Sequence, residues 1–381
     1  MNSYNSIEKI YSQEDFLKEI RIKISYGIKY EINYDFEDYK GRPYFIKKIS
    51  VSSKDENDPL YKDIQNFVTK NIIQNKLENW QIFYSFKALF QYLIHDKKFN
   101  YFRGQSHNWK LLPGIFRAEN KYREEFENIY KDISSEFPDK LRYFQLEKSC
   151  IEDRCNNIAI LQHYGLKTSL LDISSNPFIA MLFMLTNCDE SCTVPTLYCF
   201  LVDDSLHNKK NIFQKIKKNN ANLRISAQKG AFLNFDKIYT INNRNIKKIH
   251  TVKIYLEFDD IYREIEKMID ILKERLTKDS DDVKSTCNSY IGILEEEKNK
   301  MNKSNGEKTK KYLIGYIRNE LLNKLCEYYY FEEDLFPDFE NRIKYIAEKY
   351  ECNKYEERKT RMNIEKINII KNGKNHDNES A

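Results

Sequence analysis

The stretch Phe99-Asn100-Tyr101-Phe102-Arg103-Gly104 has the aromatic composition of a β-strand that carries one charge. Alternation along a strand places Phe99, Tyr101 and Arg103 on one face. An arginine on an apolar face needs a partner, because its charge cannot be removed. Either a carboxylate such as Asp172 pairs with Arg103, or Arg103 points into a cleft where a ligand supplies the anion. Gly104 would let a ligand or a neighbouring strand approach the backbone closely.

Helices and further strands are predicted on both sides of this strand. The periodicity and end signals predict helices after Ser12, from Asp58-Pro59, from about Ser85, over Leu141 to Tyr164 and from Asn176-Pro177 through Leu185. Strands are predicted at Ile22 to Tyr26, Thr196 to Val202 and Val252 to Phe258. The fold class is therefore α+β, with a central mixed sheet flanked by helices and a helical insertion near the C-terminal end.

Three regions are predicted along the chain. Residues 1–80 form an N-terminal α/β leading region, 81–350 the main domain, and 351–381 a polar tail that is partly disordered. A helical insertion interrupts the main domain at about 263–330. Its narrow apolar stripes predict a hairpin or three-helix excursion that packs mainly on itself, with a break at Ser304-Asn305-Gly306.

Composition disfavours several classes of protein. Charged residues make up 32% of the 381 residues, but both signs are interspersed and the net charge is only +5, which disfavours nucleic-acid binding. The longest apolar run, near Phe178 to Leu185, is too short for a membrane span, and no secretion signal begins the chain. The eight cysteines have neither disulfide-framework nor zinc spacing. These features predict a cytoplasmic protein with reduced thiols, no metal site and no membrane partner.

Five segments in order resemble the FRG domain, a family named for its Phe-Arg-Gly motif. They are Tyr101 to Ser106 with Trp109, Leu112-Pro113 and Phe116-Arg117; Leu161 to Thr168 with Leu170-Leu171-Asp172; Asn176 to Ala180; Gln228 to Phe232; and Leu335 to Asp338. The sequence departs from the family at Ser169, where an Arg is common, and at Ile173, where a Trp is common. If the lost Arg normally binds phosphate or carboxylate, this chain binds its ligand differently or not at all.

The candidate site residues come from these segments. The catalytic candidates are Arg103, His163, Asp172 and Gln228, and the ligand-binding candidates are Arg103, Gln105, Gln162, Thr168 and Ser169. Asp172 either orients His163 as a base or caps the segment Ser174-Ser175-Asn176. His163 is also explained as a histidine at a helix C-terminus, where the helix dipole favours its charged form. Gln228 is either a turn residue or a partner for a ribose hydroxyl.

The first segment is also similar to the opening strand of ADP-ribosyltransferases, where an aromatic-Arg-Gly strand grips a nicotinamide dinucleotide. By that likeness Arg103 holds a phosphate, Thr168 or Ser169 takes the role of the middle polar strand, and Gln228 stands where a glutamate is expected. A neutral amide cannot stabilise a developing oxocarbenium with full charge, so the likeness implies weak or altered catalysis.

Two functions follow as hypotheses. In the first, the domain binds or acts on a nucleotide or dinucleotide through Arg103, and the resemblance implies a role in bacterial stress or phage defence; the cofactor and the reaction stay open. In the second, the chain is a scaffold without enzymatic activity that docks a protein partner through its helical insertion.

Overall fold

The structure is a computed structural model, and it describes residues 16–28, 42–73, 80–146, 151–186, 194–207, 213–215, 227–236, 247–259, 268–274, 276, 281–300, 303–335, 342–343 and 346–347. No helix in these ranges combines the length and the apolar character that crossing a membrane requires.

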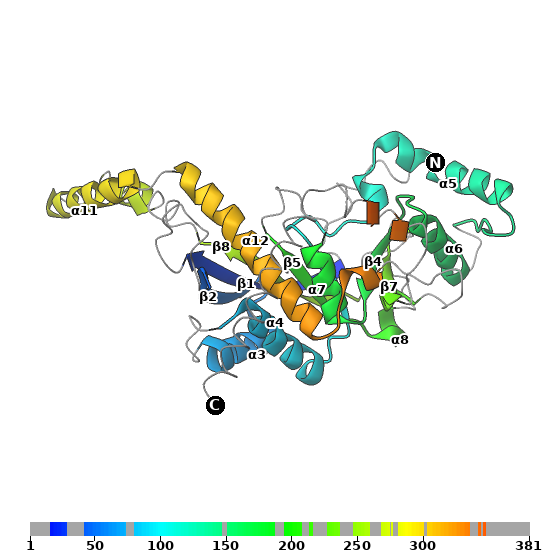
Figure 1. The fold of residues 1–381 in the computed structure, drawn as a ribbon, viewed down its shortest axis with the longest axis horizontal. Helices are drawn as coiled ribbons and strands as arrows, with labels where there is room; N and C mark the ends of the chain where they lie inside the picture. The colour runs from blue at the N-terminus through cyan, green and yellow to red at the C-terminus, as the bar shows by residue number, and fades with distance from the viewer. Residues whose placement is uncertain are drawn as a thin grey trace, which may run out of the picture.

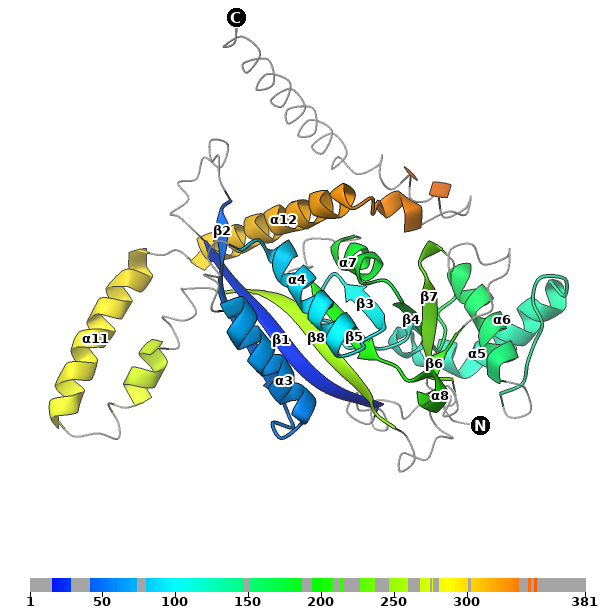
Figure 2. The same cartoon turned by 90° about the horizontal axis from the view of Figure 1, so that it is seen from below.

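The described strands form one mixed sheet of eight, in the order β2-β1-β8-β5-β3-β4-β7-β6. β1 and β8 run parallel and side by side (Figure 2), whereas the other neighbours are antiparallel. The α+β class with a central mixed sheet is thus confirmed. The strands are β1 (Leu17–Ile28), β2 (Tyr44–Ser53), β3 (Tyr101–Gln105), β4 (Leu170–Ser174), β5 (Thr196–Leu201), β6 (Phe213–Gln214), β7 (Gly230–Asn234) and β8 (Ile249–Phe258).

Four helices pack on one face of the sheet: α3 (Pro59–Phe67), α4 (Ile82–Gln91), α7 (Pro177–Leu185) and α12 (Lys303–Glu327). Figure 1 shows α12 crossing this layer past α4 and α7. Alternate residues of the central strands, such as Phe102, Leu197 and Val252, supply the sheet side of this core. Because strand side chains alternate, their neighbours belong to the opposite face.

The described residues cover the second face of the sheet at one end. There α5 (Asn120–Glu136), α6 (Ile151–His163) and the turn Gly114–Arg117 pack with Tyr101, Tyr198 and Phe200 of the central strands. Towards β1 and β8 this face carries polar side chains that stay partly exposed, among them Arg21 and Lys253. The described residues also include the helices α8 (Asp204–His207) and α11 (Asp281–Lys300), and residues 268–274 are helical as well.

Short sequence signals set several helix ends as expected. The side chain of Asp58 accepts a hydrogen bond from the backbone N–H of Leu60, and a proline follows it at the first helical position. Asn176 caps α7 in the same way, through the N–H groups of Phe178 and Ile179. Gly165 follows α6 with φ +96°, the left-handed conformation that glycine adopts most easily.

Several expectations were wrong. The helix expected to carry Leu17 and Ile20 is strand β1, because Ile20, Ile22, Ile24 and Tyr26 alternate into the core. The helix expected from Leu141 is described only at Ile151–His163, and residues 141–146 are not helical. Phe99 precedes β3 and packs with Phe102 rather than with Tyr101.

The expected insertion is also not a unit that packs mainly on itself. Leu313, Ile317, Leu321 and Leu325 of α12 are fully buried against the main core, although α11 stands away from the body (Figure 1). The expected break at Ser304-Asn305-Gly306 falls inside α12.

The domain boundaries themselves stay predictions. Residues 17–53 of the leading region supply β1 and β2 to the same sheet as the main domain. The polar tail at 351–381 lies outside the described residues.

Candidate functional site

Arg103 lies on β3, between β5 and β4. Its Nη1 donates a hydrogen bond of 2.7 Å to the backbone carbonyl oxygen of Asp172. The side chain of Arg103 is 18% exposed, whereas that of Asp172 is 59% exposed and its Oδ2 is 3.9 Å from Nη1. A long contact to a solvated carboxylate adds little to the stability of the folded protein. The main hydrogen-bond partner of Arg103 is therefore a neutral carbonyl and not a buried carboxylate.

The guanidinium of Arg103 is only partly satisfied. Its Nε is buried and has no acceptor among the described residues. Burial lowers the pKa of Arg103, the charge of Asp172 opposes this, and the positive charge of Arg117 lowers it further. The charge of Arg117 thus acts against that of Arg103, and the carboxylate near Arg103 is exposed, an arrangement that an added anion would stabilise.

Side-chain hydrogen bonds join Thr168 and Gln162 to Asp172, whose backbone carbonyl in turn binds Arg103. The hydroxyl of Thr168 donates to Oε1 of Gln162, and Nε2 of Gln162 donates to Oδ1 of Asp172 at 2.6 Å. Thr168 is buried and its hydroxyl also accepts from the backbone N–H of Leu170. The structure thus brings Arg103, Gln162, Thr168 and Asp172 together, at the end of α6 and the start of β4.

Gln105 lies two residues after Arg103 on the same strand, and therefore on the same face. Its side chain is 8% exposed, and its Oε1 has no donor among the described residues. A buried donor of Arg103 and a buried acceptor of Gln105 are thus left without partners on one strand. Such groups carry a desolvation cost that a ligand with matching polar atoms would remove.

His163 and Gln228, the two other catalytic candidates, have no hydrogen bond to the Arg103 group among those described. His163 ends α6, and its ring centroid lies 5.1 Å from that of Tyr164. The side-chain Nε2 of Gln228 donates to the backbone carbonyl oxygen of Leu335 at 3.1 Å. The backbone carbonyl oxygen of Gln228 accepts from the hydroxyl of Ser174. The side chain of Gln228 therefore ties the segment after α12 to the turn before β7.

Asp172 does not cap the segment Ser174-Ser175-Asn176. Asn176 caps α7, and the carboxylate of Asp172 binds Gln162 instead. The capping expectation was wrong because the carboxylate lies on β4, beside the end of α6, where the Gln162 amide can reach it.

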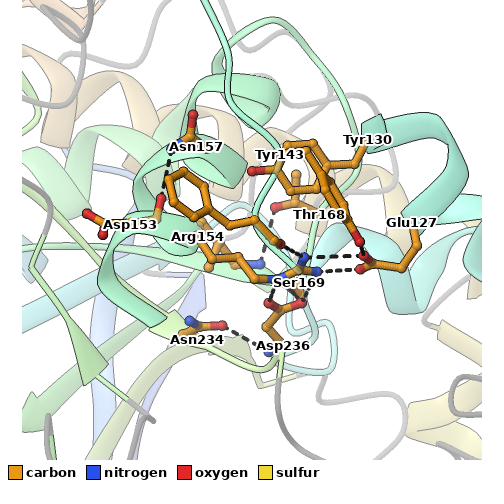
Figure 3. A network of polar contacts seen from close by, with 12 residues as sticks. Glu127, Tyr130, Tyr143, Asp153, Arg154, Asn157, Thr168, Ser169, Asn234 and Asp236 are labelled. Atoms are coloured by element: carbon orange, nitrogen blue, oxygen red, sulfur yellow. Dashed lines mark hydrogen bonds and ion pairs between the residues drawn. The ribbon is translucent and has the colours of Figure 1, made fainter. Parts of the chain in front are cut away.

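Ser169 belongs to a separate buried network around Arg154 (Figure 3). Its hydroxyl lies 3.2 Å from Oδ1 of Asp236 and is fully buried. Arg154, only 2% exposed, binds Asp236 through Nε at 2.5 Å, Glu127 through Nη2 and the carbonyl oxygen of Phe144 through Nη1. Two carboxylates and a carbonyl neutralise and saturate this guanidinium, so it is a structural ion-pair cluster.

Gly104 is required by packing. A Cβ at this position would lie 1.8 Å from the carbonyl oxygen of Ala180 and 2.5 Å from the backbone nitrogen of Met184. Helix α7 is therefore the neighbour that approaches the backbone here, rather than a ligand or a strand.

Residues 98–192 match the family model of the FRG domain. The chain contains an FRG domain. No curated protein and no solved structure matches the chain. The matched stretch runs from β3 past α7 and includes Arg103, Arg117 and Asp172, whereas Gln228 lies beyond it.

The sequence reasoning missed two features of this FRG domain. Arg117 was noted only as part of a motif, and its nearness to Arg103 depends on the turn Gly114–Arg117 packing on the loop before β4, where the Ile115 N–H binds the carbonyl of Thr168. Arg154 was missed because it shares the buried side of α6 with apolar residues such as Ile158. Among the described residues, no group of His, Cys, Asp and Glu is arranged to hold a metal ion.

Proposed function

We propose that the FRG domain binds a nucleotide-like anionic ligand through Arg103. The observation that carries the proposal is the state of this side chain: its guanidinium is held by a backbone carbonyl, while its Nε has no acceptor in the described part of the chain. An arginine fixed by one edge and unsatisfied at another is preorganised for two-point binding of a phosphate.

The neighbouring groups suit the rest of a nucleotide. Arg117 adds positive charge next to the phosphate position. Oε1 of Gln105 and the exposed carboxylate of Asp172 are acceptors for ribose hydroxyls or a base N–H. Gln162 and Thr168 hold the Asp172 carboxylate in place through their hydrogen bonds and act as positioning residues.

Binding is favoured over ADP-ribosyl transfer as the activity. Transfer would need a polar group in the middle position and an anion in place of the late glutamate. Here the hydroxyl of Ser169 is turned to Asp236, and the neutral side chain of Gln228 is bound to the carbonyl of Leu335. Neither group supplies negative charge to a ribose held at Arg103.

A thermal-shift screen tests the proposal, because a ligand that binds only the folded state raises the melting temperature. The probes are inorganic pyrophosphate, AMP, ADP and NAD. We expect at least one to stabilise the wild-type protein, and Arg103→Ala to abolish the shift. Arg142→Ala removes an exposed arginine outside the site and should keep the shift. No shift with any probe, or an equal shift in Arg103→Ala, would overturn the proposal. A role in stress or phage defence would depend on the same arginine.

A second candidate function, docking of a protein partner, rests on a separate observation. Met268 and Ile271, together with Tyr290 and Ile293 of α11, are 54–58% exposed on the part of the structure that stands away from the body (Figure 1). Contiguous exposed apolar surface marks interaction sites, and these four side chains are the candidates for such a surface here. Co-purification of a protein partner with the wild type but not with Ile271→Lys/Ile293→Lys would support docking, and equal recovery with both would reject it.

A further inference from the structure

The face of the sheet that carries Arg103 continues across three more strands, and two of them carry a cation in register with Arg103. Arg103 of β3 lies opposite Tyr198 of β5, and Tyr198 lies opposite Lys253 of β8. Lys253 in turn lies opposite Arg21 of β1. Directly opposed residues on paired strands share a face, so these four side chains form one row.

Within this row, Lys253 differs from the other lysines and arginines near it. Its Nζ lies 5.6 Å from the ring centroid of Tyr198 and 5.7 Å from that of Tyr255, and it has no carboxylate partner within the described ranges. By contrast, Arg21 pairs with Glu19 at 2.7 Å, and Lys23 pairs with Glu257 at 2.9 Å. Partial burial lowers the pKa of Lys253, the charge of Glu19 opposes this shift, and the positive charge of Arg21 adds to it.

Tyr198 separates the two unsatisfied cations. Its ring is 1% exposed, and its hydroxyl is directed to the carbonyl oxygen of Trp109 at 3.5 Å. Adjacent strands lie about 4.8 Å apart, so the backbones of Arg103 and Lys253, two strands apart, are separated by roughly 10 Å. The buried ring of Tyr198 stands between the two cations, so a ligand whose two phosphates are held apart by a sugar suits them better than a single phosphate.

We propose that Lys253 is a second anion subsite of the Arg103 site, and that the ligand is a nucleoside bisphosphate, with phosphates on two different ribose carbons. The inference rests on the proposed function and specifies its ligand class. Arg103 takes one phosphate, Lys253 takes the other, and the nucleoside spans Tyr198. The same chemistry occurs in a free bisphosphate and at the end of a nucleic-acid strand.

Calorimetric titrations with four probes test this inference: AMP, ADP, adenosine 3′,5′-bisphosphate and the dinucleotide pdApdA. We expect the bisphosphate to bind the wild type about tenfold more tightly than AMP or ADP, as one added charge-assisted contact would give. Lys253→Gln should remove that gain and leave AMP affinity within about twofold of the wild type. Lys23→Gln, on the same face but paired with Glu257, is the matched control and should change neither affinity.

The outcomes separate this inference from the proposed function. If AMP binding depends on Arg103 but the bisphosphate gains nothing over ADP, or Lys253→Gln weakens AMP and bisphosphate equally, the second subsite is wrong and the Arg103 site stands. If no probe binds, both are wrong. If pdApdA binds more tightly than the bisphosphate and loses that advantage in Lys253→Gln, the subsite stands and its source is a nucleic-acid end. Equal unfolding midpoints for the wild type, Lys253→Gln and Lys23→Gln confirm that affinity, not folding, has changed.

Discussion

Two arginines of this FRG domain show how environment decides whether a charge serves stability or binding. Arg154 is enclosed by Asp236, Glu127 and a carbonyl, so its hydrogen bonds are internal. Arg103 has one backbone carbonyl as its short contact and a solvated carboxylate at 3.9 Å. The contacts of Arg154 satisfy its buried charge within the protein. Those of Arg103 leave part of its guanidinium able to bind another molecule.

This contrast predicts different stability effects. Arg154→Ala leaves two carboxylates facing each other in a buried network, and should lower the free energy of unfolding by about 3–5 kcal/mol. Arg103→Ala loses one hydrogen bond and a weak ion pair, and should cost about 1 kcal/mol. Urea unfolding measures both. A loss of stability in Arg103→Ala as large as that in Arg154→Ala would assign Arg103 a structural role.

Gly104 gives a second prediction at the residue scale. Gly104→Ala places a methyl group against the backbone of α7, and the backbone cannot move aside as a flexible side chain would. We expect a loss of roughly 3 kcal/mol or more. Gly315→Ala in α12 is the control: nothing lies within 4 Å of its added Cβ, and alanine favours a helix, so stability should hold or rise. A stable, unchanged Gly104→Ala protein would refute the close packing of β3 on α7.

At the scale of elements, α12 is tied to the sheet by apolar packing and by one polar contact. The hydroxyl of Tyr44 on β2 donates to Oε1 of Glu320 at 2.6 Å. Burial raises the pKa of Glu320 above its ordinary value of 4.5, although the bond from Tyr44 opposes the shift. The folded protein therefore holds this proton more tightly than the unfolded chain does.

The sign of the pH effect follows from that difference. A carboxyl whose pKa is raised in the folded state loses stabilising effect as pH rises from its unfolded pKa through its folded pKa. Glu320→Gln keeps an oxygen acceptor for Tyr44 and removes the titration. We expect the stability of the wild type relative to Glu320→Gln to fall as pH rises above 4.5, and then to become constant. A relative stability that rises with pH in this range would contradict the burial of Glu320.

The elements that sequence patterns predicted are those with local signals. Asp58 and Asn176 are caps followed by proline, and the alternation at Ile22 to Tyr26 and at Val252 to Phe258 identifies strands regardless of context. The packing of α12 was mispredicted because a narrow apolar stripe fits a partner helix or a distant core equally well. Hydrogen bonds join Arg103, Gln162, Thr168 and Asp172, which come from segments that the motifs singled out, and their role as a ligand site stays a prediction. The positions of Arg117 and Lys253 depend on a turn and on strand register that no local pattern encodes.

At the scale of the whole molecule, the sheet pairs segments that lie far apart in the sequence. β1, near the start, pairs in parallel with β8, which follows the FRG match by more than fifty residues. α12 then returns across α4 and α7. The core is therefore assembled from distant segments, and among the described residues the part around α11 stands apart from it (Figures 1 and 2).

A pair of deletions tests whether α12 belongs to the main core and the part around α11 does not. Replacing residues 268–300 by a short flexible linker removes α11 and its small local core but leaves α12 in place, and should preserve a cooperative unfolding transition. Extending the deletion through 327 removes Leu313, Ile317, Leu321 and Leu325, and should abolish that transition, since each buried leucine or isoleucine contributes about 2–5 kcal/mol. A cooperative transition in the longer deletion would show that α12 is dispensable.

The central claim is that the Nε–H of Arg103 is reserved for a ligand anion. The most direct measurement is NMR of arginine Nε–Hε signals, with the Arg103 signal assigned by its loss in Arg103→Lys and Arg154 as the internal reference. During titration with adenosine 3′,5′-bisphosphate, we predict that the Arg103 signal moves progressively and saturates with binding while the Arg154 signal stays in place. An Arg103 signal that does not move while calorimetry shows the protein saturated with ligand would contradict the account.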